Sequence, residues 1–203
     1  MKGDFVFAAP GDLETRFHLA KVYLQLGKNE QALAALQSVY SAKPETPGLA
    51  AALGDVNALL KNYPDSEKYY RQALAATPGK PELHRALGQT LLEEQKLGEA
   101  ENEFRTALKL DPHNREAMKG VASSLYLEKR YAEAIPFIQA LLRAPGAPAG
   151  LYFIVATCFD HLRARPEALE AYDRYLDLSH DQNPDQEWQA RQRAKLLHRE
   201  LRK

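Results

Sequence analysis

Apolar residues recur along the chain at helical spacing, in short segments separated by breaks. Leu19, Tyr23 and Leu26 form one such series, with consecutive members three or four residues apart, and they therefore fall on one face of a helix. A break at residues 27–29 follows, and a second helical segment runs to Pro44. The pattern predicts pairs of amphipathic helices joined by tight turns.

The helix pairs repeat at a fixed interval, which prolines mark at positions 10, 44, 78 and 112. Counting from Leu13 gives five units, 13–46, 47–80, 81–114, 115–148 and 149–182. Two series of small residues keep the same interval: Ala20, Gly54, Gly88, Ala122 and Ala156, and Ala32, Ser66, Ala100, Ala134 and Ala168. We expect the two series to face each other within each pair, because small side chains let antiparallel helices approach closely.

Helix-start signals agree with these units. Side chains that can cap free amide groups stand one residue before three of the first helices, at Asp12, Thr46 and Asn114. Prolines occupy opening positions, where their missing N–H group is harmless, at Pro47, Pro64, Pro81 and Pro166. The sequence therefore predicts where most of the helices begin.

The two ends of the chain differ from the repeats. Residues 183–203 predict one last helix, with Asn183 as its cap and an apolar stripe that includes Trp188. We expect Trp188 to pack on the fifth unit, with a role as a partner anchor as the alternative. Residues 1–12 carry apolar side chains where the end of a second helix would place them, which suggests the tail of a preceding repeat. On that hypothesis the chain is cut from a longer protein or begins after a removed leader.

These residues resemble the tetratricopeptide repeat (TPR), a 34-residue helix–turn–helix unit. The third unit fits the TPR pattern best, with Leu87, Gly88, Ala100, Phe104, Ala107 and Pro112. Units four and five depart from it, because they carry Gly146 and His180 where the final proline belongs. The resemblance implies an all-α fold, a right-handed α-solenoid (superhelix) of helix hairpins, with residues 183–203 as its capping helix. The first helices would then line an inner, concave groove.

The groove residues implied by this geometry form three-residue sets, one from each first helix. Aromatic and arginine side chains among them are typical anchors of protein interfaces. For Phe17 and Phe153, packing against neighbouring repeats is the alternative. The sets are Phe17, Lys21 and Leu24; Ala51, Asp55 and Ala58; Arg85, Gln89 and Leu92; Lys119, Ser123 and Tyr126; and Phe153, Thr157 and Asp160.

Composition excludes several other classes of function. Lysine plus arginine and aspartate plus glutamate both total 27, and this neutral balance argues against nucleic-acid binding. No apolar stretch approaches the length of about 18 residues that is typical of a membrane span, so we expect no membrane insertion. The single cysteine, Cys158, lies in an apolar helix and is expected to be an inert core residue. The histidines lack ligand spacing and no catalytic motif is present, so we expect no metal, no cofactor and no enzyme.

The leading functional hypothesis is a non-catalytic scaffold that binds a peptide or helical segment of a partner protein in the groove. One alternative is a structural segment of a longer solenoid, or a module that self-associates through its N-terminal end. Another is an accessory domain of a larger enzyme. A chaperone-type carboxylate clamp is not supported, because at most one of its positions fits in any register. We expect a soluble protein, with the cytoplasm and, if a leader was removed, the bacterial periplasm both open.

Overall fold

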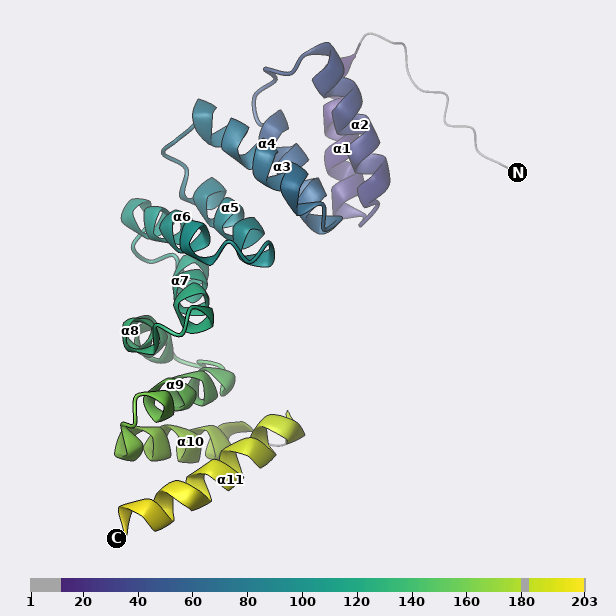
Figure 1. Cartoon of the computed structure of the whole chain (residues 1–203). Coiled ribbons are helices and arrows are strands. Elements are labelled where there is room, and N and C mark those ends of the chain that lie inside the picture. The colour runs from purple at the N-terminus through teal and green to yellow at the C-terminus, as the bar shows by residue number, and fades with distance from the viewer. Residues whose placement is uncertain (1–11, 180–182, 203) are drawn as a thin grey trace, which may run out of the picture. The chain divides into compact units, whose positions relative to one another are not determined.

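The computed structural model describes residues 12–179 and 183–202, and these form eleven helices and no strand (Figure 1). The described chain is therefore an all-α helical repeat. The helices are α1 (Leu13–Gln25), α2 (Asn29–Ala42), α3 (Leu49–Leu59), α4 (Tyr63–Ala76), α5 (Pro81–Glu93), α6 (Leu97–Leu110), α7 (Arg115–Leu127), α8 (Tyr131–Leu142), α9 (Gly150–His161), α10 (Arg165–Ser179) and α11 (Pro184–Leu201).

The turns that follow α1, α3, α5, α7 and α9 share one left-handed backbone position. This position recurs at the repeat interval, with φ angles between 59° and 68°, on Gly27, Lys61, Gln95, Lys129 and Arg163. After α1, the amide of Gly27 donates to the Leu24 carbonyl at 3.1 Å and that of Lys28 to the Tyr23 carbonyl at 2.9 Å. These are the two bonds of a Schellman C-cap. The interval read from the sequence is thus also present in the backbone.

Side-chain caps begin three of the helices as predicted. The Asp12 carboxylate accepts from the Thr15 amide at 3.2 Å at the start of α1, and the Asn114 side chain accepts from the Ala117 amide at 3.0 Å at the start of α7. Asn183 does the same for α11, with Pro184 in the first helical position. Each cap satisfies an amide that would otherwise lack a partner within its helix.

The predicted start of α3 is wrong. Thr46 does not cap this helix: its hydroxyl donates to the Lys43 carbonyl at 2.8 Å, and its own carbonyl accepts from the Leu49 amide at 3.0 Å. An additional turn therefore separates α2 from α3 and places Pro47 outside the helix. Gly48 becomes the N-cap, with φ of 78°, a conformation that glycine adopts without steric cost.

The chain divides into two compact units, which are described separately. The N-terminal unit ends at Gln95 and contains α1 to α5. Side chains from its first three helices form a hydrophobic core, to which the partly buried Leu24 and Tyr69 add cover; the core residues are Phe17, Ala20, Ala32, Leu36, Val39, Leu49, Ala52, Leu53 and Val56.

Two small residues bring α3 and α4 close together in the N-terminal unit. The Ser66 hydroxyl donates to the Gly54 carbonyl at 3.0 Å, so the predicted facing of these two positions is confirmed. A Cβ atom built on Gly54 would lie 2.7 Å from the ring of Tyr70, which is less than any relaxed contact allows. The backbone of α3 therefore approaches α4 as closely as a glycine permits.

The C-terminal unit begins at Lys96 and contains α6 to α11. A close approach joins α6 and α7, where a Cβ atom on Gly120 would lie 2.4 Å from the Phe104 ring. Gly120 does not belong to either periodic series of small residues, so the repeat pattern did not predict this contact. The buried Glu101 carboxylate forms ion pairs with Arg105 at 2.7 Å and with Arg130 at 2.6 Å. The second pair connects α6 with the start of α8.

The last helix, α11, packs on α10 (Figure 1). Ala190, Ala194 and Leu197 are buried, but Trp188 is 65% exposed, so the predicted packing of Trp188 on the fifth unit is wrong. The physical reason is helical geometry: each residue turns the helix by about 100°, and Trp188 therefore lies nearly opposite the buried face. Leu201, the last residue of α11, is exposed as well.

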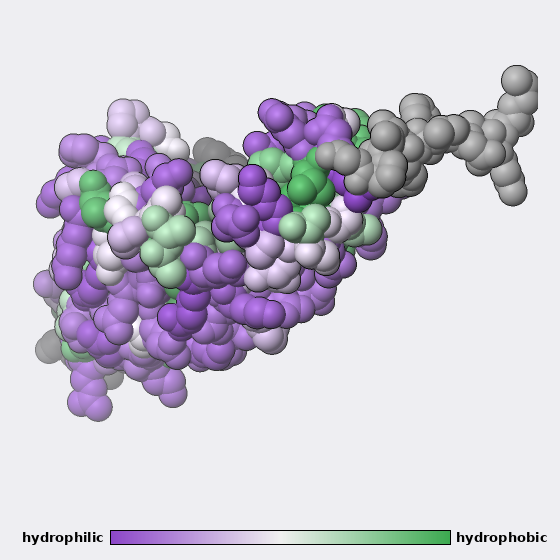
Figure 2. All heavy atoms as spheres, turned by 90° about the horizontal axis from the view of Figure 1, so that it is seen from above, coloured by the Kyte–Doolittle hydropathy of each residue, from purple (hydrophilic) through white to green (hydrophobic). Residues whose placement is uncertain are grey.

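The surface is mainly hydrophilic, as the charged and polar composition of the chain predicts. On the face in Figure 2 most residues are hydrophilic, and the hydrophobic ones form separate spots rather than one continuous patch. None of the described helices has the length and apolar character that crossing a bilayer requires. Apart from Asp12, the predicted remnant of a preceding repeat lies outside the described residues, as does His180.

Candidate functional site

The predicted groove residues of α1 take part in packing. Phe17 is only 8% exposed and lies within the core of the N-terminal unit, and Leu24 packs against the same core. The exposed Lys21 places its ammonium nitrogen 4.5 Å from the centre of the Phe17 ring, a cation–π distance. Of the two roles considered for Phe17, the structure shows packing.

On α3, the predicted residue Asp55 accepts a hydrogen bond from a neighbouring helix. The Tyr70 hydroxyl of α4 donates to the Asp55 carboxylate at 2.6 Å. Burial of the Tyr70 ring, and after it the negative charge of Asp55, raise the pKa of Tyr70 far above its ordinary value. The two alanines predicted on this helix, Ala51 and Ala58, are half-buried.

The predicted residues of α5 are in part engaged within their own helix. The Gln89 side-chain amide donates to the Glu93 carboxylate at 2.9 Å, and both residues are exposed. Arg85 and Leu92 are half-buried. In the N-terminal unit, several of the predicted residues therefore contact other residues of the same unit.

A cavity of about 340 Å³ brings three predicted residues of the C-terminal unit together. Lys119, Ser123 and Tyr126, all from α7, contribute to its wall, and most of the remaining lining is aliphatic. We call this space the α7–α9 cavity; its other lining residues are Ala122 and Leu127 of α7, Ile138 and Leu141 of α8, and Leu151 and Ile154 of α9. The cavity thus combines an apolar interior with the polar side chains of Lys119 and Ser123.

The polar part of this lining is accessible. Lys119 and Ser123 are exposed, and the Lys119 ammonium lies 3.1 Å from the Glu116 carboxylate, which is exposed too. An ion pair between two exposed side chains contributes little, because water screens the charges. Lys119 can therefore exchange this partner for a carboxylate or carbonyl of a bound segment at small cost.

The predicted residues of α9 do not line the cavity. Phe153 packs against Tyr172 and Tyr175 of α10, with ring centres 6.0 Å and 5.2 Å away. The Thr157 hydroxyl donates to the Ile154 carbonyl at 2.7 Å, and its oxygen lies 3.4 Å from the Tyr126 hydroxyl. Phe153 thus packs against the second helix of its own unit, and Thr157 lies beside the cavity residue Tyr126.

Asp160, the last predicted residue, is bound by the final helix. Arg193 of α11 donates to both Asp160 carboxylate oxygens, at 2.5 Å and 2.7 Å. This two-point pairing is the strongest geometry for an arginine and a carboxylate, and it raises the pKa of Arg193. Asp160 is therefore already neutralised within the C-terminal unit, where it attaches α11 to α9.

Two aromatic residues near the cavity were missed by the sequence analysis. The Tyr131 ring packs edge-on against Tyr126 at 5.7 Å and stacks on His161 at 4.4 Å, nearly parallel. The stack connects the start of α8 with the end of α9 and supports Tyr126 from the side. The repeat interval alone does not indicate that these two rings lie near the cavity, because their stacking depends on how α8 packs on α9.

The aliphatic lining was missed for a different reason. Apolar residues of second helices, such as Ile138 and Leu141, are expected in the core, and both are indeed buried. Buried side chains nevertheless form the floor of an open cavity where the neighbouring helices do not cover them completely. Among the aliphatic lining residues, Leu127 is the exposed one, at 47%, and it marks the opening.

Two features of the described chain bear on chemistry: its single cysteine and the grouping of possible metal ligands. Cys158 is buried, and burial raises the pKa of its thiol to about 11, which disfavours the reactive thiolate. Among residues 12–179 and 183–202, no three histidine, cysteine, aspartate or glutamate side chains gather as a metal site would require.

The sequence was compared with profiles of known protein families. The sequence profile of the Tetratricopeptide repeat family matches residues 17–81 and 85–149. The chain belongs to this family. Tetratricopeptide repeat proteins are generally protein-interaction scaffolds, so the family indicates a protein partner. A comparison with curated protein sequences gave no match.

Solved TPR structures share the fold. The TPR protein YrrB is 20% identical, with 82% of this chain and 86% of YrrB covered and a TM-score of 0.74. MamA from strain AMB-1 is 19% identical, with 82% and 91% covered and a TM-score of 0.76. PilF from Pseudomonas aeruginosa is 21% identical, with 93% and 90% covered and a TM-score of 0.68. At these identities the likeness concerns the fold alone.

Proposed function

We propose that this TPR chain is a non-catalytic scaffold that binds an extended or helical segment of a partner protein over the α7–α9 cavity. The proposal includes five repeats, residues 13–182, and a capping helix from residue 183. The observation that carries it is the cavity itself, because it gathers Lys119, Ser123 and Tyr126 around an aliphatic interior. Two of these three residues remain exposed in the folded chain.

The cavity suits one large apolar side chain of the partner. Its interior consists of aliphatic side chains, and transfer of a leucine or phenylalanine side chain out of water contributes about 1.5–3 kcal/mol. The Lys119 ammonium and the Ser123 hydroxyl can bond to carbonyl groups of the bound backbone beside that anchor. The expected ligand is therefore a segment with an apolar anchor flanked by accessible carbonyl or carboxylate oxygens.

The fold is compatible with this role. YrrB is described as a TPR protein with an unusual peptide-binding site. That description concerns YrrB, but it supports the idea that a TPR surface of this kind can hold a peptide. On this chain we propose the α7–α9 cavity as such a site, on the strength of its own lining residues.

The test begins with peptide selection from a random displayed library against the whole chain. Binding of the selected peptides is then measured for Leu127→Glu, which puts a carboxylate at the opening of the apolar cavity. The control is Leu59→Glu: Leu59 lies two repeat intervals earlier and is 57% exposed, against 47% for Leu127. We expect Leu127→Glu to weaken binding at least about tenfold, as loss of one buried apolar anchor would do, and Leu59→Glu to leave it unchanged. Equal effects of the two substitutions would contradict the proposed site.

A further inference from the structure

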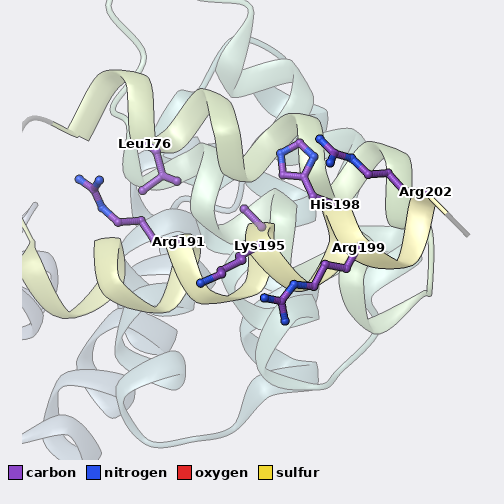
Figure 3. A pocket seen from close by; sticks show the side chains of 7 residues that line it. Leu176, Arg191, Lys195, His198, Arg199 and Arg202 are labelled. Atoms are coloured by element: carbon purple, nitrogen blue, oxygen red, sulfur yellow. The ribbon is translucent and has the colours of Figure 1, made fainter.

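The last helix carries a basic surface that the packing of α11 on α10 does not use. Cationic side chains project from α11 around a cavity of about 440 Å³, and Leu176 of α10 completes the wall (Figure 3). Besides Leu176 and the buried Ala194, the lining residues are all basic: Arg191, Lys195, His198, Arg199 and Arg202. No acidic residue belongs to this lining.

Several of these cations lack a carboxylate partner. Arg191 is 3.4 Å from the Glu187 carboxylate, and His198 is 3.7 Å from that of Asp173. Within the described part of the chain, Lys195, Arg199 and Arg202 form no ion pair.

Glu200, which follows Arg199 in the sequence, is paired elsewhere. Glu200 pairs with Arg165 of α10 at 3.0 Å, so its charge is already engaged. The chain as a whole has no net charge, and this positive surface is therefore a local concentration. Uncompensated like charges repel one another, and an anionic partner would relieve that repulsion.

Trp188 extends the same surface. It is 65% exposed, and Lys195 and Arg199 follow it by about two and three helical turns, which places all three on one side of α11. Tryptophan and arginine are the residue types most enriched among interface anchors, and an exposed tryptophan beside cations has the composition of a protein-binding surface.

We propose that the α11 basic surface, formed by Trp188, Arg191, Lys195, Arg199 and Arg202, binds an acidic segment of a partner protein. It shares no residue with the α7–α9 cavity and is a second docking surface. Charge complementarity selects carboxylates as the ligand groups, and Trp188 supplies an apolar contact beside them. The surface is accessible without any change in the fold, because these five residues are exposed.

A protein segment fits this surface better than a membrane does. A helix that lies in a lipid interface inserts its apolar face, but the apolar residues Ala190, Ala194 and Leu197 of α11 are buried. Protein partners are also what the family indicates.

The probe is a synthetic peptide of glutamates with one central leucine. About eight residues suffice, because an extended peptide of that length spans the helical distance from Trp188 to Arg202. Trp188 is the single tryptophan of the chain, so its fluorescence reports directly on this surface. We expect the peptide to shift the emission to shorter wavelength, with an affinity that falls as salt is added.

The decisive variant is Lys195→Glu/Arg199→Glu/Arg202→Glu. Its matched control reverses three other exposed cations of the C-terminal unit, Lys109→Glu/Arg115→Glu/Arg143→Glu, and gives the same net charge. We expect the first variant to weaken peptide binding at least about tenfold and the control to change it less than about twofold. The corresponding glutamine variant of the three α11 residues keeps helix-forming side chains, and it should also lose binding.

Other outcomes overturn the proposal. Equal weakening by both reversals would mean that net charge, not this surface, attracts the peptide. Binding to vesicles containing phosphatidylserine without binding to the peptide would assign the surface to a membrane. Binding of inorganic phosphate that the peptide cannot displace, or absence of any binding, would remove the acidic segment as the ligand.

Discussion

The two units use equivalent repeat positions in different ways. In the N-terminal unit, Phe17 lies in the core and Asp55 holds the Tyr70 hydroxyl. In the C-terminal unit, Lys119 and Ser123, which occupy the equivalent positions, are exposed and line a cavity. A repeat position therefore does not by itself make a residue available to a partner. Its availability depends on the type of side chain and on the contacts of that side chain within its own unit.

One repeat position shows this most clearly. From the first unit to the fifth it holds Phe17, Ala51, Arg85, Lys119 and Phe153. Phe17 is buried and the half-buried Phe153 packs on the Tyr172 ring, whereas Lys119 keeps its charge in water. Substitution of the buried Phe17 should thus affect stability, and substitution of the exposed Lys119 should affect binding.

The largest expected effect is that of Phe17→Ala. Removal of a buried phenylalanine side chain leaves a cavity and costs about 3–5 kcal/mol of unfolding free energy. Lys119→Ala, at the equivalent position, should change that free energy by less than about 0.5 kcal/mol. Urea unfolding followed by circular dichroism measures both, and comparable losses would break the contrast between the units.

The next largest effect is expected beside Lys119. Gly120→Ala puts a Cβ atom 2.4 Å from the Phe104 ring, and relief of that clash requires shifts that cost about 1–3 kcal/mol. Gly98→Ala is the control, because its Cβ atom would meet only the Glu128 side chain at 3.6 Å. Thermal unfolding should separate the two variants, and an unchanged melting temperature for Gly120→Ala would refute the close approach of α6 and α7.

Tyr70→Phe tests the internal role of Asp55 and should cost about 1 kcal/mol, because one hydrogen bond to a carboxylate is lost. Burial and Asp55 raise the pKa of Tyr70 in the folded chain, so the folded state keeps the proton longer than the unfolded state does. Stability should therefore be complete below about pH 10, the ordinary tyrosine pKa, and fall above it. The fall should be shallower in Tyr70→Phe, and identical unfolding profiles from pH 8 to 11 would contradict the hydrogen bond.

The smallest effects should be equal in both units. Lys61 and Lys129 adopt left-handed backbone angles of 60° and 61°, which strain any residue with a Cβ atom. Lys61→Gly and Lys129→Gly should each stabilise the chain by about 0.5–1 kcal/mol. Because the turn is the same, a gain in one unit and a loss in the other, measured by urea unfolding, would show that the turns are not equivalent.

Local signals predicted most of the fold. Neighbouring residues predict the helical spacing and the caps at Asp12 and Asn114, and the repeat interval predicts the facing of Gly54 and Ser66. The structure contains all of these features. Thr46 failed as a cap because a competing turn used its hydroxyl. The same side chains can cap a helix or stabilise a turn, and the sequence alone does not show which of the two hydrogen bonds forms.

The candidate site was predicted only in part. The family geometry gave Lys119, Ser123 and Tyr126, because first-helix positions follow the repeat. It did not give the aliphatic floor, since Ile138 and Leu141 have the pattern of ordinary core residues. Nor did it show that Arg193, on the last helix, neutralises Asp160, which depends on how α11 packs.

The most direct test of the binding site uses the isoleucine methyl groups. The chain has three isoleucines, of which Ile138 and Ile154 line the α7–α9 cavity and Ile135 does not. A methyl NMR spectrum of chain labelled only at isoleucine is recorded while a peptide selected against the whole chain is added. The account predicts shifts of the Ile138 and Ile154 signals with Ile135 nearly unchanged, whereas saturated binding that leaves Ile138 and Ile154 unmoved would contradict it.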